Sequence, residues 1–161
     1  MLDEAKTRAL AILQQRYGEE NPANRTHLDE SELDDASELI GVSAIKYYDL
    51  RQNRISTYPF NYDKMLDPKG NTAVYLIYAY ARICSIIGKA APEVVEGLNG
   101  YTIHIEEMQE RNLCLTLCRF PDLLDTSMNE LALNKLCELI YEIACRFSEF
   151  YNACKVLDTP Q

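Results

Sequence analysis

The residues best suited to chemistry in this sequence are tyrosines and arginines that lie close together between residues 46 and 82. Most of the 11 tyrosines fall in this stretch, interleaved with lysine and arginine. Aromatic rings stack on unpaired bases and guanidinium groups bind phosphates or base edges, so the combination is typical of proteins that hold single-stranded RNA loops. Tyr75, Tyr78 and Arg82 are spaced three and four residues apart, which places them on one face of a helix.

Arg82 is the most informative of these residues. It lies in a stretch, residues 71–89, that is apolar almost all round. A charged side chain on such a helix is rarely buried without a partner, so Arg82 is expected to need an acidic residue or an anionic ligand. Each tyrosine taken alone is equally compatible with a core position that leaves only its hydroxyl at the surface.

The charge distribution favours the same region. The formal net charge of the chain is −9, which taken alone argues against binding to nucleic acid. Residues 41–90, however, contain seven Lys or Arg residues against three Asp, and the segments on either side are acidic. The basic segment is therefore a candidate phosphate-facing surface, with chance fluctuation as the alternative.

The sequence contains no catalytic or metal-binding motif. It lacks a glycine-rich phosphate loop, a Gly-x-Ser-x-Gly nucleophile elbow and a His-Glu-x-x-His zinc motif. Cys114 and Cys118 are four residues apart, but no second Cys or His pair has zinc-site spacing, and His27 and His104 are isolated. We therefore expect no catalytic residue and no metal site, and we interpret the six cysteines as small, reduced core residues.

Helical periodicity dominates the elements that must position these side chains, and no convincing strand alternation occurs. The fold class expected is all-α, a helical bundle. The helices expected are 2–17, 29–51, 71–89, 102–120 and 129–154, with loops at 19–27, 52–69 and 91–100. The apolar helix 71–89 should lie at the centre of the bundle, Gly41 should bend the second helix, and Pro121 should end the fourth.

The last helix has a regular apolar pattern. The residues spaced by three and four along one face are Leu136, Ile140, Ile143, Phe147, Phe150 and Cys154. The opposite face is charged, and Glu142 and Arg146 are spaced for an i,i+4 ion pair. The apolar face leaves an alternative function open, that of a helical protein-interaction or scaffold module without RNA binding.

Five stretches of the sequence closely resemble the C-terminal part of eukaryotic-type arginyl-tRNA synthetases. They occur in the family's order and span nearly the whole chain: KYYDLRQNR (46–54), FNYDKML (60–66), GNTAVYLIYAYAR (70–82), RFPD (119–122) and FSEFYNAC (147–154). The Gly-Asn-Thr helix with its Tyr and Arg spacing is the most specific of these motifs, and the Phe-Pro piece is the weakest.

The resemblance implies the DALR anticodon-binding bundle of a class I ligase that joins arginine to its tRNA with ATP and Mg²⁺. By motif, Tyr78 and Arg82 fall on a tyrosine and an arginine that contact anticodon bases, and Tyr151 falls on a later tyrosine with the same role. Tyr75 has no family role and shares only the helical face. The partners implied are the anticodon stem-loop of arginine tRNA and the ligase's own catalytic domain, with no DNA and no membrane.

Two departures from the family limit what this stretch should do alone. The nucleotide-binding signatures of class I synthetases are absent, and the family continues past the position of Gln161. We expect residues 1–55 to form a post-catalytic helical connector that contacts the tRNA stem, and residues 56–161 an anticodon-binding bundle truncated at its C-terminus. Such a fragment should not aminoacylate tRNA. The charged N-terminus lacks a secretory signal and no stretch is long enough to span a bilayer, so we expect a cytoplasmic location.

Overall fold

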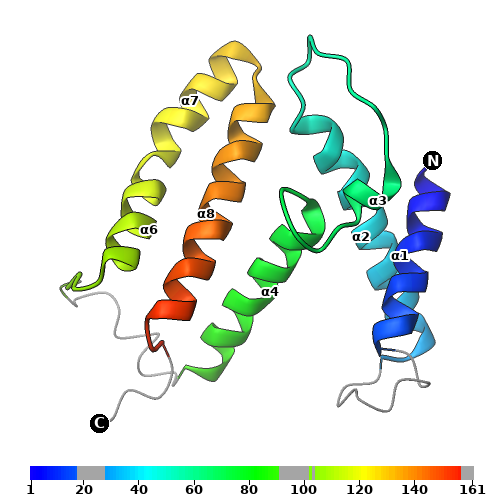
Figure 1. Cartoon of the computed structure of the whole chain (residues 1–161), viewed down its shortest axis with the longest axis horizontal. Coiled ribbons are helices and arrows are strands. Elements are labelled where there is room, and N and C mark those ends of the chain that lie inside the picture. Colours follow the sequence, from blue (N-terminus) through cyan, green and yellow to red (C-terminus); the bar gives the residue numbers. More distant parts are fainter. Residues whose placement is uncertain (18–27, 91–101, 103, 157–161) are drawn as a thin grey trace. The chain divides into compact units, whose positions relative to one another are not determined.

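The computed structural model describes residues 1–17, 28–90, 102 and 104–156, and within these the chain is helical without strands, which confirms the all-α prediction (Figure 1). The helices are α1 (Leu2–Tyr17), α2 (Glu30–Leu50), α3 (Tyr62–Met65), α4 (Ala73–Lys89), α6 (Met108–Cys118), α7 (Phe120–Glu130) and α8 (Leu133–Ala153). The expected loops at 19–27 and 91–100 lie outside the described residues.

The chain forms two compact units, Met1–Tyr75 and Leu76–Gln161, and the division falls inside α4. The sequence predicted a different division, at residue 55, between a connector and the anticodon-binding bundle. That division is one of function and not of compactness, and it stays a prediction. Among the described helices none is long and apolar enough to cross a membrane.

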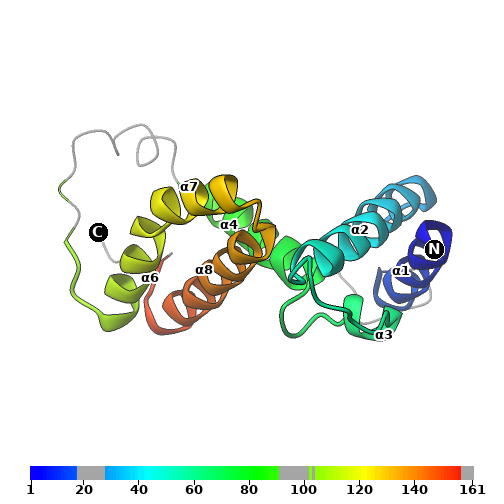
Figure 2. The same ribbon diagram turned by 90° about the horizontal axis from the view of Figure 1, so that it is seen from above.

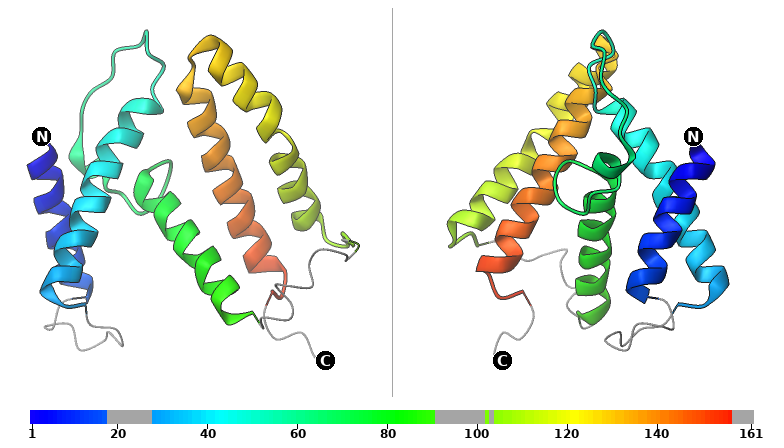
Figure 3. Two further views of the ribbon diagram at one scale, coloured as in Figure 1. Left: turned by 180° about the vertical axis from the view of Figure 1, so that it is seen from behind. Right: turned by 45° about the vertical axis from the view of Figure 1, so that its right-hand side comes forward.

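The first unit is built on α1 and α2, which run antiparallel and pack along their lengths (Figures 1 and 3). Its core contains Ala9, Ala44, Tyr48, Met65 and Leu66, so the short helix α3, which the sequence did not predict, closes the core. α2 begins where Asp29 caps it: the Asp29 carboxylate accepts the Glu32 N–H at 2.8 Å, and the Glu32 side chain accepts the Asp29 N–H at 2.9 Å.

Gly41 allows the close approach of these two helices. A Cβ placed on Gly41 would lie 2.7 Å from the backbone N of Lys6 and 2.9 Å from the backbone C of Ala5. α2 runs as one helix through Gly41, and the bend predicted there stays a prediction. The absence of a side chain at Gly41 is required by the packing against α1.

In the second unit α8 packs against both α6 and α7 (Figure 2). The prediction of one helix over 102–120 was wrong at both ends. α6 begins at Met108 rather than at residue 102. Its N-terminus is capped by the Glu110 carboxylate, which accepts the N–H groups of Glu106 and Glu107 at 2.9 and 3.0 Å. Pro121 stands in the first turn of α7, where its missing N–H costs no hydrogen bond, so the proline begins a helix instead of ending the chain's helical run.

The face that α8 buries differs from the predicted stripe. Cys137, Leu139, Ala144 and Phe147 are buried, whereas Ile140 is 38% exposed. The Glu142–Arg146 pair was also wrong: Glu142 accepts from Arg119 of the loop after α6 at 2.8 Å, which leaves Arg146 to pair with Glu149, likewise at 2.8 Å. A partner from outside α8 has thus replaced the i,i+4 neighbour within the helix.

The cysteines do not form a shared core. Only Cys137 is buried, and Cys84 and Cys118 are exposed. The interpretation of all six as core residues was therefore wrong. Helix α4 likewise departs from its predicted central position, because Tyr78, Tyr80 and Ile87 are more than half exposed and Ala73 and Ala79 are its buried residues.

Candidate nucleic-acid interface

The start of α4 is fixed by a short network in the loop before it. The Thr72 hydroxyl donates to the Asp67 carbonyl at 2.7 Å and accepts the Tyr75 N–H at 3.2 Å, which caps the first turn of the helix. Gly70 has φ of +98°, a conformation that side-chain-bearing residues rarely adopt. The Gly-Asn-Thr motif is thus the local signal that ends the loop and begins the helix.

Three of the predicted site residues meet on one surface of the second unit. Arg82 Nη2 donates to the Tyr78 hydroxyl at 2.6 Å, and its guanidinium carbon lies 5.0 Å from the centre of the Tyr78 ring. The same carbon lies 4.8 Å from the centre of the Tyr151 ring, which α8 supplies. We call Tyr78, Arg82 and Tyr151 the tyrosine–arginine cluster.

The electrostatics of the cluster leave its positive charge available. Sequence reasoning expected Arg82 to find an acidic partner or an anionic ligand. Among the described residues no carboxylate lies within 4 Å of it, and two aromatic rings and one hydroxyl hold it instead. Cation–π contacts stabilise a guanidinium without neutralising it, so Arg82 can still bind an anion or a base edge.

The hydrophobic packing of α8 orients the tyrosine that it supplies. Phe147 is 8% exposed, and its ring centre lies 6.1 Å from that of Tyr151 and 6.5 Å from that of Phe150. Phe147 thereby supports one side of the cluster from the core. Its predicted place in the apolar stripe was correct, but its contact with Tyr151 could not be read from the stripe alone.

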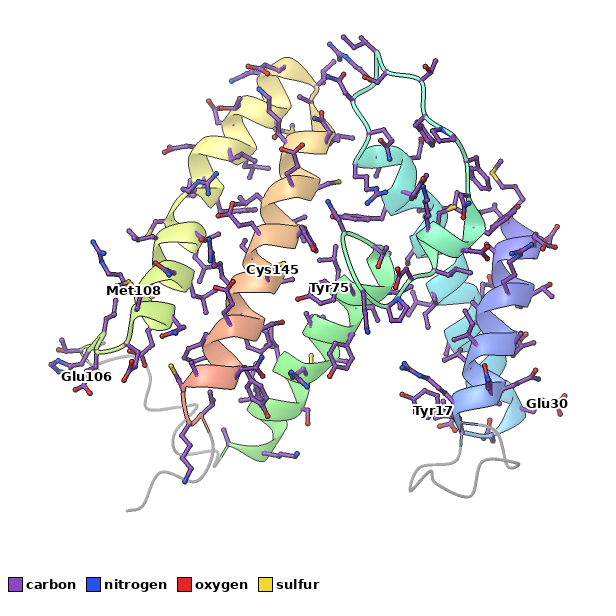
Figure 4. The ribbon with its side chains drawn as sticks, viewed as in Figure 1. Tyr17, Glu30, Tyr75, Glu106, Met108 and Cys145 are labelled. Carbon is purple, nitrogen blue, oxygen red and sulfur yellow. The ribbon has the colours of Figure 1, made fainter. Side chains whose placement is uncertain are left out.

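Tyr78 is the most exposed ring of the tyrosine–arginine cluster. Its side chain is 55% exposed, and Tyr80, also on α4, is 68% exposed. An exposed ring beside a cation, as in Tyr78 and Arg82, is a surface on which an unpaired base can stack. Tyr80 is two residues further along the helix and so points to another face. Tyr75 lies one turn earlier on α4, is half-buried, and belongs to the first compact unit (Figure 4). It is not part of the tyrosine–arginine cluster as defined here.

The first unit carries exposed basic side chains in the segment that the charge distribution singled out. They are Lys46 on α2, Arg54 in the loop after it, Lys64 on α3, and Lys69 before α4. Their exposure suits contact with phosphates. Among the described residues no group of three or more His, Cys, Asp or Glu side chains is arranged to hold a metal ion.

Comparison with known proteins identifies the family. Residues 76–161 match the DALR anticodon binding domain, and residues 1–62 match the catalytic domain of class I (R) tRNA synthetases. The chain is 40% identical to the chloroplastic/mitochondrial arginine–tRNA ligase of Arabidopsis thaliana, over all of this chain and 24% of the ligase. It is 40% identical to the cytoplasmic arginine–tRNA ligase of the same plant, over 97% of this chain and 25% of the ligase.

Solved structures agree with these sequence matches. The arginyl-tRNA synthetase of Plasmodium falciparum superposes with a TM-score of 0.81 at 39% identity, over 98% of this chain and 27% of that one. The Thermus thermophilus arginyl-tRNA synthetase superposes with a TM-score of 0.75 at 27% identity, over 99% and 26%. The chain thus spans about a quarter of the length of the relatives that it matches. It belongs to the DALR anticodon-binding domain family and corresponds to that region of the arginyl-tRNA synthetases, as its motifs predicted.

Proposed function

We propose that the tyrosine–arginine cluster binds the anticodon loop of arginine tRNA. The observation that carries the proposal is the Arg82 guanidinium, which contacts the rings of Tyr78 and Tyr151 and pairs with no carboxylate of the described residues. Tyr78 and Tyr151 offer faces for base stacking, and Arg82 offers donors for a phosphate or a base edge. Tyr75, one turn away, is proposed as a weaker contact on the same helix.

The genetic code suggests which base is read. Every arginine codon has G in its middle position, so every matching anticodon has a central C. Cytosine presents the carbonyl O2 and the ring N3 as acceptors on its Watson–Crick edge, which suits the N–H donors of a guanidinium. We assign the central C to Arg82, with stacking on an adjacent tyrosine ring.

We further propose that the first unit contacts the stem of the same RNA through phosphates. The exposed Lys46, Arg54, Lys64 and Lys69 support this role, because exposed cations bind the backbone without regard to sequence. Residues 1–55, which include Lys46 and Arg54, would then act as the stem-contacting connector. Residues 56–161 would act as the anticodon-binding bundle, and Lys64 and Lys69 would add phosphate contacts near its start.

The chemical step belongs, in this proposal, to the rest of an arginine–tRNA ligase. Such a ligase would use ATP and Mg²⁺ in a class I catalytic domain, probing its tRNA through this bundle. This chain spans about a quarter of the length of the ligases that it matches, and we propose that it is inactive on its own. Curated relatives include cytoplasmic and chloroplastic/mitochondrial ligases, and we propose the cytoplasm for this one.

The test compares two arginines that lie in the same unit. Arg82→Ala should weaken binding of an arginine tRNA anticodon stem-loop by about tenfold or more, because it removes a charge-assisted contact with the RNA. Arg146→Ala removes the same charge from an exposed pair with Glu149 and should change affinity by less than about threefold. Fluorescence anisotropy at constant salt measures both, with circular dichroism as a check on folding. A larger loss for Arg146→Ala contradicts the assignment.

A further inference from the structure

The Arg82 guanidinium contacts two rings that come from different helices of the second unit. Tyr78 precedes Arg82 by four residues on α4, and its hydroxyl accepts from Arg82 Nη2 at 2.6 Å. Tyr151 belongs to α8, and its ring centre lies 4.8 Å from the guanidinium carbon. The Tyr151 ring is therefore a contact through which α8 can fix the direction of the Arg82 N–H donors.

The Tyr151 ring is in turn supported by Phe147, one turn earlier on α8. The two ring centres lie 6.1 Å apart and the ring planes are inclined by 30°, which is within the range of a direct aromatic pair. Phe147 is 8% exposed, whereas Tyr151 is half-buried. Buried side chains in a packed interior keep to few rotamers, so Phe147 gives the ring of Tyr151 a fixed support.

The direction of the Arg82 donors matters for one kind of RNA contact more than for others. A guanidinium that reads a base edge must present its planar set of N–H donors in one orientation. Ordering a long side chain during binding costs affinity, and this cost is smaller when the side chain is already held in place. Phosphate contacts and base stacking do not distinguish one base from another in this way.

We propose that Phe147 is a positioning residue for base recognition, which acts on Arg82 through the ring of Tyr151; this inference rests on the proposed function. Phe147 is buried and touches no RNA itself. Without its ring, Tyr151 loses its support in the core and Arg82 takes more orientations before the RNA binds. The preference for a central C then falls, while the contacts with phosphates remain.

The experiment uses variants of the whole chain and two arginine tRNA anticodon stem-loops, one with a central C and one with a central U, at one salt concentration. Phe147→Leu should lower the preference for C from about tenfold to about twofold, and should change affinity for the U stem-loop by less than about twofold. Phe150→Leu is the matched control, because among the described residues its ring contacts Phe147 and neither Tyr151 nor Arg82. It should leave the preference at about tenfold.

A second pair of variants tests whether the effect passes through Arg82. In a chain that carries Arg82→Ala, adding Phe147→Leu should change affinity for either stem-loop by less than about twofold, because the side chain that Phe147 positions is gone. Phe147→Met fills the same space with a flexible side chain and should behave as Phe147→Leu does. It supplies the measurement if the leucine variant does not fold, which circular dichroism would show.

Equal weakening of both stem-loops by Phe147→Leu would mean that its ring supports only the fold or a stacking surface, and this result overturns the inference. An unchanged preference for C, an equal loss of preference from Phe150→Leu, or a further loss of affinity for the C stem-loop in the Arg82→Ala chain overturns it as well. Equal binding of both stem-loops by the unsubstituted chain contradicts base reading in the proposed function, and the inference with it.

Discussion

Substitution of Gly41 by alanine tests the packing on which the first unit depends. The new Cβ would lie 2.7 Å from the Lys6 backbone N and 2.9 Å from both the Ala5 carbonyl carbon and the Lys6 Cα. Favourable contact between such atoms needs about 3.5–4.0 Å. Since every atom in the way belongs to the backbone of α1, no side chain can rotate aside, and α1 must move away from α2 by about 1 Å.

The size of the effect follows from two opposing terms. Moving α1 loosens the contacts of Ala5 and Ala9, which are 1% and 2% exposed, and overpacking of this kind costs about 3 kcal/mol. Alanine in place of glycine within a helix returns about 1 kcal/mol. We therefore expect Gly41→Ala to lower the free energy of unfolding by about 2 kcal/mol.

Gly88→Ala is the matched control, because a Cβ at Gly88 meets nothing within 4 Å. It isolates the helix-propensity term and should be neutral or stabilising by up to about 1 kcal/mol. Urea unfolding followed by far-UV circular dichroism measures both free energies. If Gly41→Ala proves as stable as the unsubstituted chain, or if Gly88→Ala is destabilised as much, the reasoning about helix contact is refuted.

Two further predictions concern titratable groups. The backbone N–H groups of Glu107 and Glu106 hold the pKa of Glu110 below its usual 4.5, so its carboxylate stabilises the fold above that value and the contribution is lost as pH falls through the lower folded pKa. From about pH 5 to pH 3 the unsubstituted chain should lose more unfolding free energy than Glu110→Gln, and parallel pH curves would argue against this. Burial raises the pKa of the Cys154 thiol, whereas Cys84 is exposed, so iodoacetamide should modify Cys84 first; mass spectrometry showing the reverse order would contradict the structure.

Local patterns were enough to predict several elements of this fold. The amphipathic spacing of residues 2–17 predicted α1, and α2 begins directly after Asp29 because that side chain caps it. Contacts between residues far apart in the sequence were not predicted. The contact of Gly41 with α1 was not predicted because it joins residues far apart in the sequence, and Arg119 displaced Arg146 as the partner of Glu142.

In the candidate site, too, local spacing was predictable and contacts between distant residues were not. The spacing predicted that Tyr78 and Arg82 share one face of the helix, and the structure shows the i,i+4 contact between them. The acidic partner or anionic ligand expected for Arg82 is replaced by this tyrosine and Tyr151. Tyr151 comes from α8, and only the family resemblance singled it out. The hydrogen bonds from Tyr47 and Arg51 to Asn71 were not predicted, because such contacts leave no periodic pattern in a sequence.

Binding of anticodon stem-loops that differ only in the central base tests the central claim most directly. The chain would be titrated with an arginine tRNA stem-loop carrying its central C and with one carrying a central U, from about 50 to 300 mM salt. Phosphate contacts predict parallel falls in affinity with salt, and base reading by Arg82 adds a preference for C of about tenfold or more at each salt concentration. Equal affinity for the two RNAs throughout the series would contradict base reading and leave phosphate contact alone.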